Sequence, residues 1–287
     1  MFLTEFYNKQ INSIMAVTMA EISKLRTMTG AGMMDCKNAL IEAENDFEKA
    51  IEIIRKKGQA VAAKRSDREA SEGCVLAGVN GGFAAVLALK CETDFVAKNE
   101  QFIALTQSIL DKALAEKPAD LAALKALVMD GRTIEALIIE RIGITGEKME
   151  LDFYEFVNDA FAISYIHPGN KLATLVSFNK ETEYQVARDI AMQAAAMNPV
   201  SLDRASVPAK IIETELEVGR EKAREEGKPD NMLEKIAQGR LNKFYQESCL
   251  LEQSFIKDNK VTISQYLTSV DKELKATAFK RVTLNME

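Results

Sequence analysis

The chain repeats one supersecondary pattern, and this repeat limits the possible folds more than any other feature of the sequence. Residues 75–93 contain two apolar strands around a Gly-Gly pair, and residues 161–182 contain two more around a Pro-Gly pair. In both copies the second strand leads into Glu-Thr and a helical pattern, and residues 85–93 align with 173–182 with one gap. We therefore predict a duplicated core of two related α+β subdomains, each with helices packed on a small antiparallel sheet.

The first copy ends in a junction between a strand and a helix. The apolar run 83–89 predicts a buried strand, and apolar residues from Phe102 onward recur at helical spacing. Phe95 lies between the two patterns, next to Asp94, an acid suited to a helix N-terminus. Two interpretations stay open, because Phe95 either projects outward as a presented aromatic or folds back under the helix as a hydrophobic staple.

Composition narrows the class of protein. The 287 residues suffice for one large domain or two to three smaller ones, and a net charge of -6 argues against a protein that coats nucleic acid. Four cysteines without a CxxC pair favour reduced thiols in a cytosol over a disulfide framework or zinc site, although spacing alone does not exclude bridges. No apolar run approaches the roughly 20 residues that a membrane span needs.

The N-terminal part divides into an extension and a helical module. Residues 1–18 resemble neither a signal peptide nor a transit peptide, so we interpret them as an upstream start or a disordered tail. Residues 19–58 predict a compact three-helix module, with a glycine turn after the first helix and Gly58 ending the third. About forty residues bury only a small core, so we expect this module to serve as a docking head.

Met33 and Met34 open the second helix of that module. Because they are adjacent, they cannot both point into one seam, and we expect one of them to be exposed as adaptable contact surface. The alternative is that both pack at the start of the helix.

Residues 59–73 show no apolar period and predict a linker. The basic cluster within 55–68 is a candidate RNA contact. No aromatic residues lie among these basic residues, however, and the acidic balance of the chain favours an ordinary solvated helix end.

The segment between the two copies completes the first subdomain. Residues 121–129 and 133–141 predict helices, and the alternation at 149–153 predicts a strand. We expect the N-subdomain of the core to span 74–158 and the C-subdomain to span 159–287.

The C-terminal part contains a densely charged insertion. Residues 209–246 carry a thin apolar seam with a break at 227–231, which predicts a protruding antiparallel hairpin with coiled-coil packing. After it we expect a strand at 249–255, a helix at 261–274 and a last strand at 279–284.

The chain shows no convincing catalytic constellation. His167 is the single histidine, so neither a histidine metal cluster nor a conventional acid-base triad can form. Neither GxxxxGK[ST] nor GxGxxG occurs, and no pair of acids stands out by its spacing. The sequence therefore indicates a binding protein rather than an enzyme.

Three strings of residues resemble a known family. Residues 29–40 read TGAGMMDCKNAL, residues 93–99 read TDFVAKN, and residues 167–171 read HPGNK. With these strings, and LLEQ at 250–253, the chain from Met19 to its end is similar to bacterial translation elongation factor Ts. The resemblance implies a ubiquitin-associated-like N-terminal module, a two-subdomain core and a coiled-coil hairpin.

The same resemblance implies a function without covalent chemistry. It implies a cytoplasmic guanine-nucleotide exchange factor that binds elongation factor Tu, both GDP-bound and nucleotide-free, and needs no cofactor, metal or small-molecule ligand. Asp94 and Phe95 are implied to intrude near the partner's nucleotide magnesium site. The full set of implied partner contacts is Thr93, Asp94, Phe95, Val96, Lys98, Asn99, His167, Gly169, Arg26, Met33 and Met34.

The resemblance has two departures. Some family members continue into a further helix where this chain ends at Glu287, so we expect any partner contact made by that helix to be missing. Residues 1–18 have no counterpart in the family.

Two other classes of function stay open on the sequence alone. A nucleic-acid-binding adaptor would use the basic segment 55–68 with the charged hairpin, and would show a steeply salt-dependent RNA affinity. An enzyme would need a nucleophile and base at a recognisable spacing, and the sequence shows no such pair.

Overall fold

The computed structural model describes residues 17–284, which contain eleven α-helices and small antiparallel sheets. The predicted α+β class is confirmed. The chain forms two compact units. The first holds the described residues up to Gly73, Leu89–Phe102 and Ala122–Leu151, and the second holds Cys74–Ala88, Ile103–Leu121 and the described residues from Asp152 onward. Residues 1–16 of the predicted extension lie outside the described part.

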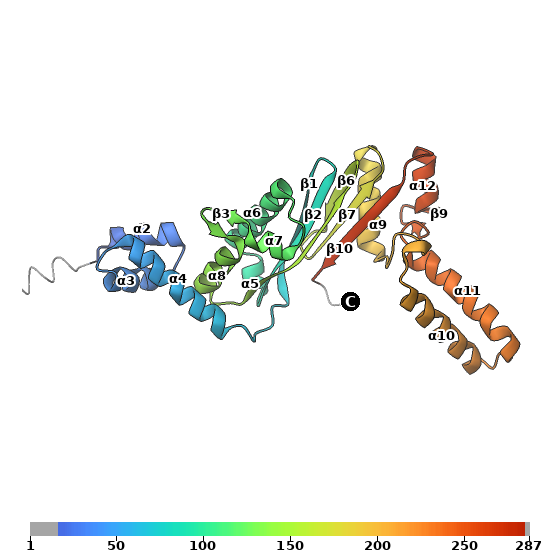
Figure 1. Cartoon of the computed structure of the whole chain (residues 1–287), viewed down its shortest axis with the longest axis horizontal. Helices are drawn as coiled ribbons and strands as arrows, with labels where there is room; N and C mark the ends of the chain where they lie inside the picture. The colour runs from blue at the N-terminus through green and yellow to red at the C-terminus, as the bar shows by residue number, and fades with distance from the viewer. Residues whose placement is uncertain (1–16, 285–287) are drawn as a thin grey trace, which may run out of the picture. The chain divides into compact units, whose positions relative to one another are not determined.

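The first unit opens with three helices, as predicted: α2 (Met19–Thr29), α3 (Met33–Glu42) and α4 (Phe47–Lys64) (Figure 1). Thr18 and Glu21 form a capping box at the start of α2, and Gly30 ends it in the left-handed region with φ 71°. The buried residues Ile22, Leu25, Cys36, Leu40 and Ala50 form the small core of this module.

The helix α4 continues past Gly58, so the prediction that Gly58 ends the third helix is wrong, and residues 59–64 are helical rather than linker. Gly58 is buried where α4 crosses α8 (Ile134–Thr145). A Cβ added to Gly143 would lie 2.5 Å from the Cα of Gly58. The two glycines therefore allow close contact between two helix backbones, a role that helical periodicity alone does not reveal.

Two three-stranded sheets carry the sequence repeat. The strands are β1 (Glu72–Asn80), β2 (Phe83–Cys91), β5 (Met149–Asn158), β6 (Phe161–Ile166), β7 (Leu172–Phe178) and β10 (Ala276–Thr283). One sheet has the order β1-β2-β5 and the other the order β10-β7-β6. In both sheets the second strand of the hairpin is central, and a strand from later in the chain pairs on its far side (Figure 1). This shared order supports the predicted duplication.

A long helix comes after each hairpin, and most of it lies in the second unit. The helix α6 (Glu100–Glu116) approaches β1 so closely that a Cβ on Gly78 would lie 2.7 Å from Leu114. The helix α9 (Tyr184–Met197) packs on β6 and β7 through Val186, Ile190 and Ala194. Within this unit, side chains of both sheets also share one apolar cluster.

Two connecting segments differ from their predictions. The expected helix at 121–129 is the short α7 (Leu121–Ala126), followed by a two-stranded ribbon of β3 (Val128–Met129) and β4 (Arg132–Thr133). Asp130 and Gly131 form its turn with positive φ, and this turn ends the helical run.

The segment after the helical hairpin is also more broken than predicted. The expected strand at 249–255 is reduced to β8 (Ser254–Phe255), because the backbone N–H groups of Glu252 and Gln253 donate to the Cys249 carbonyl in a turn. β9 (Asp258–Thr262) pairs with β8, and α12 (Ile263–Val270) begins only after a capping box at Thr262. The helix is therefore shorter than the predicted range 261–274.

The charged insertion is a hairpin of α10 (Ala209–Glu225) and α11 (Asp230–Ser248), drawn side by side in Figure 1. Gly227, with φ 71°, lies in the connection. Gly219 lets the helices approach, since a Cβ there would lie 2.9 Å from the Cα of Ala237. Every described helix of the chain is too short or too polar to cross a bilayer.

We expect the outer part of this hairpin to be dispensable for folding. Replacing residues 218–238 with a short flexible linker removes a seam that buries mainly its own residues and leaves the basal cluster around Leu241 and Tyr245 in place. The midpoint of thermal unfolding should shift by only a few degrees. As a control, Leu241→Ala should cost about 2–5 kcal/mol. Loss of the cooperative transition in the shortened chain would show that the outer seam belongs to the core.

Candidate functional site

The helix α5 (Asp94–Ala97) begins directly after β2 and forms one capped turn. Thr93 is its N-cap, and the Thr93 hydroxyl accepts a hydrogen bond from the backbone N–H of Val96 at 3.4 Å. At the other end, the backbone N–H of Lys98 donates to the Asp94 carbonyl at 3.0 Å. The predicted junction between strand and helix is confirmed.

Phe95 projects from this turn into solvent. Its side chain is 84% exposed, more than any other large hydrophobic residue of the described chain, of which Met34 follows at 64%. Ala97 provides the buried side of the same turn, and Val96 is half-buried. The staple interpretation is therefore wrong, because Phe95 does not pack under the helix.

The charged and polar residues around Phe95 bond to their own segment. Lys98 donates to the Asp94 carboxylate at 2.7 Å, and the hydrogen bond and charge of Asp94 raise the pKa of Lys98. The Asn99 side-chain oxygen caps α6 by accepting from the N–H groups of Gln101 at 2.9 Å and Phe102 at 3.3 Å. Asp94 thus presents its charge beside an ammonium, and Asn99 has a structural role.

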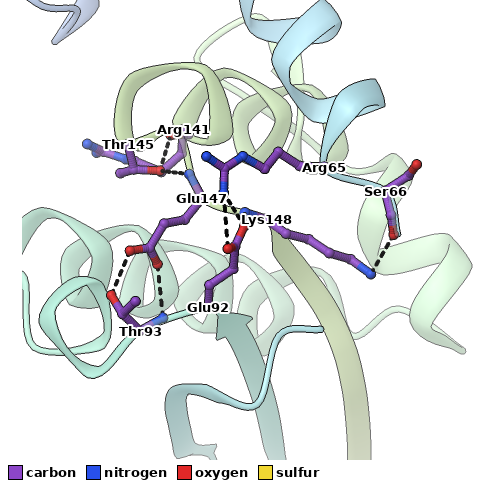
Figure 2. A network of polar contacts seen from close by, with 8 residues as sticks. All are labelled: Arg65, Ser66, Glu92, Thr93, Arg141, Thr145, Glu147 and Lys148. Carbon is purple, nitrogen blue, oxygen red and sulfur yellow. Dashed lines mark hydrogen bonds and ion pairs between the residues drawn. The ribbon is translucent and has the colours of Figure 1, made fainter. Parts of the chain in front are cut away.

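Glu92, just before the turn, is held from two sides (Figure 2). Both of its carboxylate oxygens lie 3.1 Å from Arg65, and one accepts from the Lys148 backbone N–H at 2.7 Å. The bond from Lys148, and after it the Arg65 guanidinium, lowers the pKa of Glu92. The Lys148 ammonium in turn donates to the Ser66 carbonyl at 3.0 Å.

Glu147 holds the cap itself (Figure 2). Its carboxylate accepts from the Thr93 backbone N–H at 3.0 Å and from the Thr93 hydroxyl at 2.6 Å. Gly146, with φ 72°, ends α8 in the left-handed region immediately before it. Sequence reasoning missed Arg65, Glu147 and Lys148, because no periodicity connects them with residues 92–93.

The three site residues predicted in the N-terminal helices lie on the surface of their module. Arg26 is exposed on α2, and Met33 and Met34 at the start of α3 are 39% and 64% exposed. We predicted one exposed methionine, with packing of both as the alternative, and both are exposed. Met33 therefore does not join the buried side of α3 that Cys36 and Leu40 form.

His167 and Gly169 lie in the turn between β6 and β7, in the second unit. The His167 ring nitrogen Nδ1 is 3.0 Å from the Tyr165 hydroxyl, and the side chain is exposed. Gly169 and Asn170 have φ values of 95° and 55°, so they make the reversal that places His167 at the tip.

Comparisons with known proteins identify the family. The family model described as Elongation factor TS matches residues 92–286. The chain belongs to the elongation factor Ts family. That match includes Thr93–Asn99, His167 and Gly169, whereas Arg26, Met33 and Met34 lie before it.

Relatives named Elongation factor Ts match nearly the whole chain. The one from Porphyromonas gingivalis is 63% identical over 274 residues, and that from Azobacteroides pseudotrichonymphae is 54% identical. A relative from Parabacteroides distasonis is 48% identical over 330 residues. Each alignment covers 95% of this chain and 100% of the relative. Membership in the elongation factor Ts family makes this chain a translation elongation factor of the exchange-factor type.

Within residues 17–284, histidines, cysteines and acids form no group of three that could hold a metal ion. Much of the basic segment 55–68 is paired with acids: Lys56 with Glu52, Lys57 with Asp35, and Arg65 with Glu92. These pairs weaken the positive potential that a nucleic-acid adaptor would need.

Proposed function

We propose that this chain is the cytoplasmic guanine-nucleotide exchange factor of elongation factor Tu. The exposure of Phe95 carries the proposal, because a large aromatic on a capped turn is available to enter a partner. Family membership supplies the partner. No covalent step is needed. A protein that binds the nucleotide-free GTPase more tightly than the GDP-bound form weakens GDP binding by the ratio of these two affinities.

In this mechanism Asp94 and Phe95 approach the partner's nucleotide magnesium site and promote its disruption. Thr93 and Val96 set the turn, and Lys98 and Asn99 flank it. His167 and Gly169 form a second contact, and Arg26, Met33 and Met34 a third.

Several contacts have to act together. A release acceleration of about 10⁴ requires about 5.5 kcal/mol of differential stabilisation. Burying one phenylalanine contributes only about 2–3 kcal/mol. Several exposed elements therefore have to contribute to this stabilisation together. This is consistent with proposed contacts in different parts of the chain.

The parts of the chain take roles in the same proposal. We assign docking to a ubiquitin-associated-like module at 19–58, whose third helix continues to Lys64, and we place the core subdomains at 74–158 and 159–287. The hairpin at 209–246 is assigned coiled-coil packing, which is consistent with its small buried residues Gly219, Ala223 and Ala237.

Stopped-flow measurement of fluorescent GDP release from elongation factor Tu tests the proposal. Adding the full chain should accelerate release by orders of magnitude and saturate with concentration. The physical reason is that the complex with the chain stabilises the nucleotide-free state. If a saturating concentration of the chain does not accelerate GDP release, an exchange function is excluded.

Two control measurements complete the test. Calorimetry of the chain with GDP alone should show no micromolar binding, because the sequence has no phosphate-binding loop. Steeply salt-dependent RNA binding without an effect on GDP release would instead favour the nucleic-acid adaptor.

A further inference from the structure

We infer that Glu147 is a positioning residue for the exchange reaction: its carboxylate fixes the direction in which Phe95 leaves the chain. The inference rests on the proposed function. It extends the site to a residue 54 positions away from Thr93 in sequence.

The helix α5 needs support from outside. It has four residues, and an isolated helical turn of this length is unstable because nucleation is costly. Phe95, at 84% exposure, contributes almost no packing to hold the turn, and Ala97 is the buried residue of this helix. The orientation of Phe95 therefore depends on the cap.

Glu147 orients that cap through the single proton of the Thr93 hydroxyl. Because the hydroxyl donates to Glu147 at 2.6 Å, its lone pairs are left to accept from the Val96 N–H at 3.4 Å. The second oxygen of Glu147 accepts from the Thr93 backbone N–H at 3.0 Å. One carboxylate thus holds both the backbone and the side chain of the residue that starts α5, and charge-assisted bonds of this kind are the stronger ones.

Glu147 is itself held in place. Its backbone N–H donates to Thr145 at 3.3 Å after the left-handed turn at Gly146, and the next N–H, of Lys148, donates to Glu92. Residues 147–148 therefore clamp residues 92–93 at two adjacent points (Figure 2).

The clamp is connected to the N-terminal helices. Arg65 follows the last residue of α4 and pairs with Glu92, and α4 crosses α8 at Gly58 and Gly143. The helix α4 also belongs to the module that presents Met33 and Met34. Within this unit, the contacts that hold residues 92–93 are therefore connected through α4 to the module that presents Met33 and Met34. The direction of Phe95 depends on these contacts.

Replacing Glu147 by alanine tests the positioning role in the full chain. We expect the maximal rate of GDP release from elongation factor Tu to fall about 10-fold, equivalent to about 1.4 kcal/mol. The half-saturating concentration should change less than about twofold, because the other contact surfaces are intact. Thermal unfolding should shift by only a few degrees.

Two further variants separate positioning from charge. Glu147→Gln keeps one acceptor oxygen for the Thr93 hydroxyl and should recover part of the rate. Glu135→Ala removes an exposed acid from the first turn of α8, changes the net charge equally, and should exchange like the parent.

A double-variant cycle with Phe95→Ala decides whether Glu147 acts through Phe95. If it does, the double variant should release GDP within about twofold of the Phe95→Ala rate. If the rate losses of the two single variants multiply in the double variant, or if Glu147→Ala releases GDP at the parental rate, the positioning role is overturned. The proposed function stays intact in both cases. A parental rate for Phe95→Ala itself would also overturn the positioning role and would remove Phe95 from the proposed mechanism, whereas only a lack of acceleration by the parent chain would overturn the exchange function.

Discussion

Replacing Phe95 by alanine is expected to slow catalysed GDP release about 10- to 200-fold, equivalent to about 1.4–3 kcal/mol. The free energy of unfolding should change little, because a side chain that is 84% exposed loses almost no packing when it is truncated. Stopped-flow exchange and urea unfolding of the same preparation measure the two effects separately.

Asp94→Ala is the companion variant for this experiment. It should also slow exchange if the carboxylate disturbs the partner's magnesium site, and should cost a few tenths to about 1 kcal/mol of helix-end stabilisation. It also frees the Lys98 ammonium, which is now 2.7 Å from Asp94. A Phe95→Ala chain that unfolds and exchanges like the parent would remove α5 from the mechanism.

The repeat was predictable because its signals are local. Apolar runs of strand length, Gly-Gly and Pro-Gly turns, and helical spacing after them all lie within about thirty residues of each other. The two hairpins and the helices after them follow these signals closely. The shared strand order, with β5 and β10 in matching places, adds what the sequence pattern alone did not show.

Close helix contacts were not predictable in the same way. Gly58 has the sequence context of a helix end, yet its meaning comes from Gly143, which is far along the chain. Gly219 likewise lies in the hairpin seam because Ala237 approaches it. A glycine has the same local preferences in both roles, so only the tertiary partner distinguishes them.

In the candidate site, too, the local features were predictable from the sequence and the tertiary contacts were not. The segment 93–99 could be singled out from its position between two patterns and from its family resemblance, but periodicity did not decide which way Phe95 points. Glu92 and Thr93 are held by Arg65, Glu147 and Lys148, which are charged residues in ordinary local sequence contexts. Charged residues that are far apart in the sequence hold one another only when the fold brings them together. A single sequence does not show which of them will be neighbours.

Phe102→Ala is expected to have the opposite effect from Phe95→Ala. Phe102 is 1% exposed in the first turn of α6, so its truncation should cost about 3–5 kcal/mol. This is a large part of the roughly 5–15 kcal/mol that stabilises a typical domain. Urea unfolding should show the loss as a lower midpoint, and Phe102→Leu, which keeps most of the volume, should cost less than about 1.5 kcal/mol.

The two phenylalanines thus form a matched pair, because the same truncation is made seven residues apart, once at an exposed side chain and once at a buried one. At a temperature where Phe102→Ala remains folded, its exchange rate per folded molecule should fall less than that of Phe95→Ala, because Phe102 offers no surface to a partner. The reverse result, with several kcal/mol lost at Phe95 and less than about 1 kcal/mol at Phe102, would mean that Phe95 packs under the helix after all. The contact with the GTPase would then have to lie elsewhere.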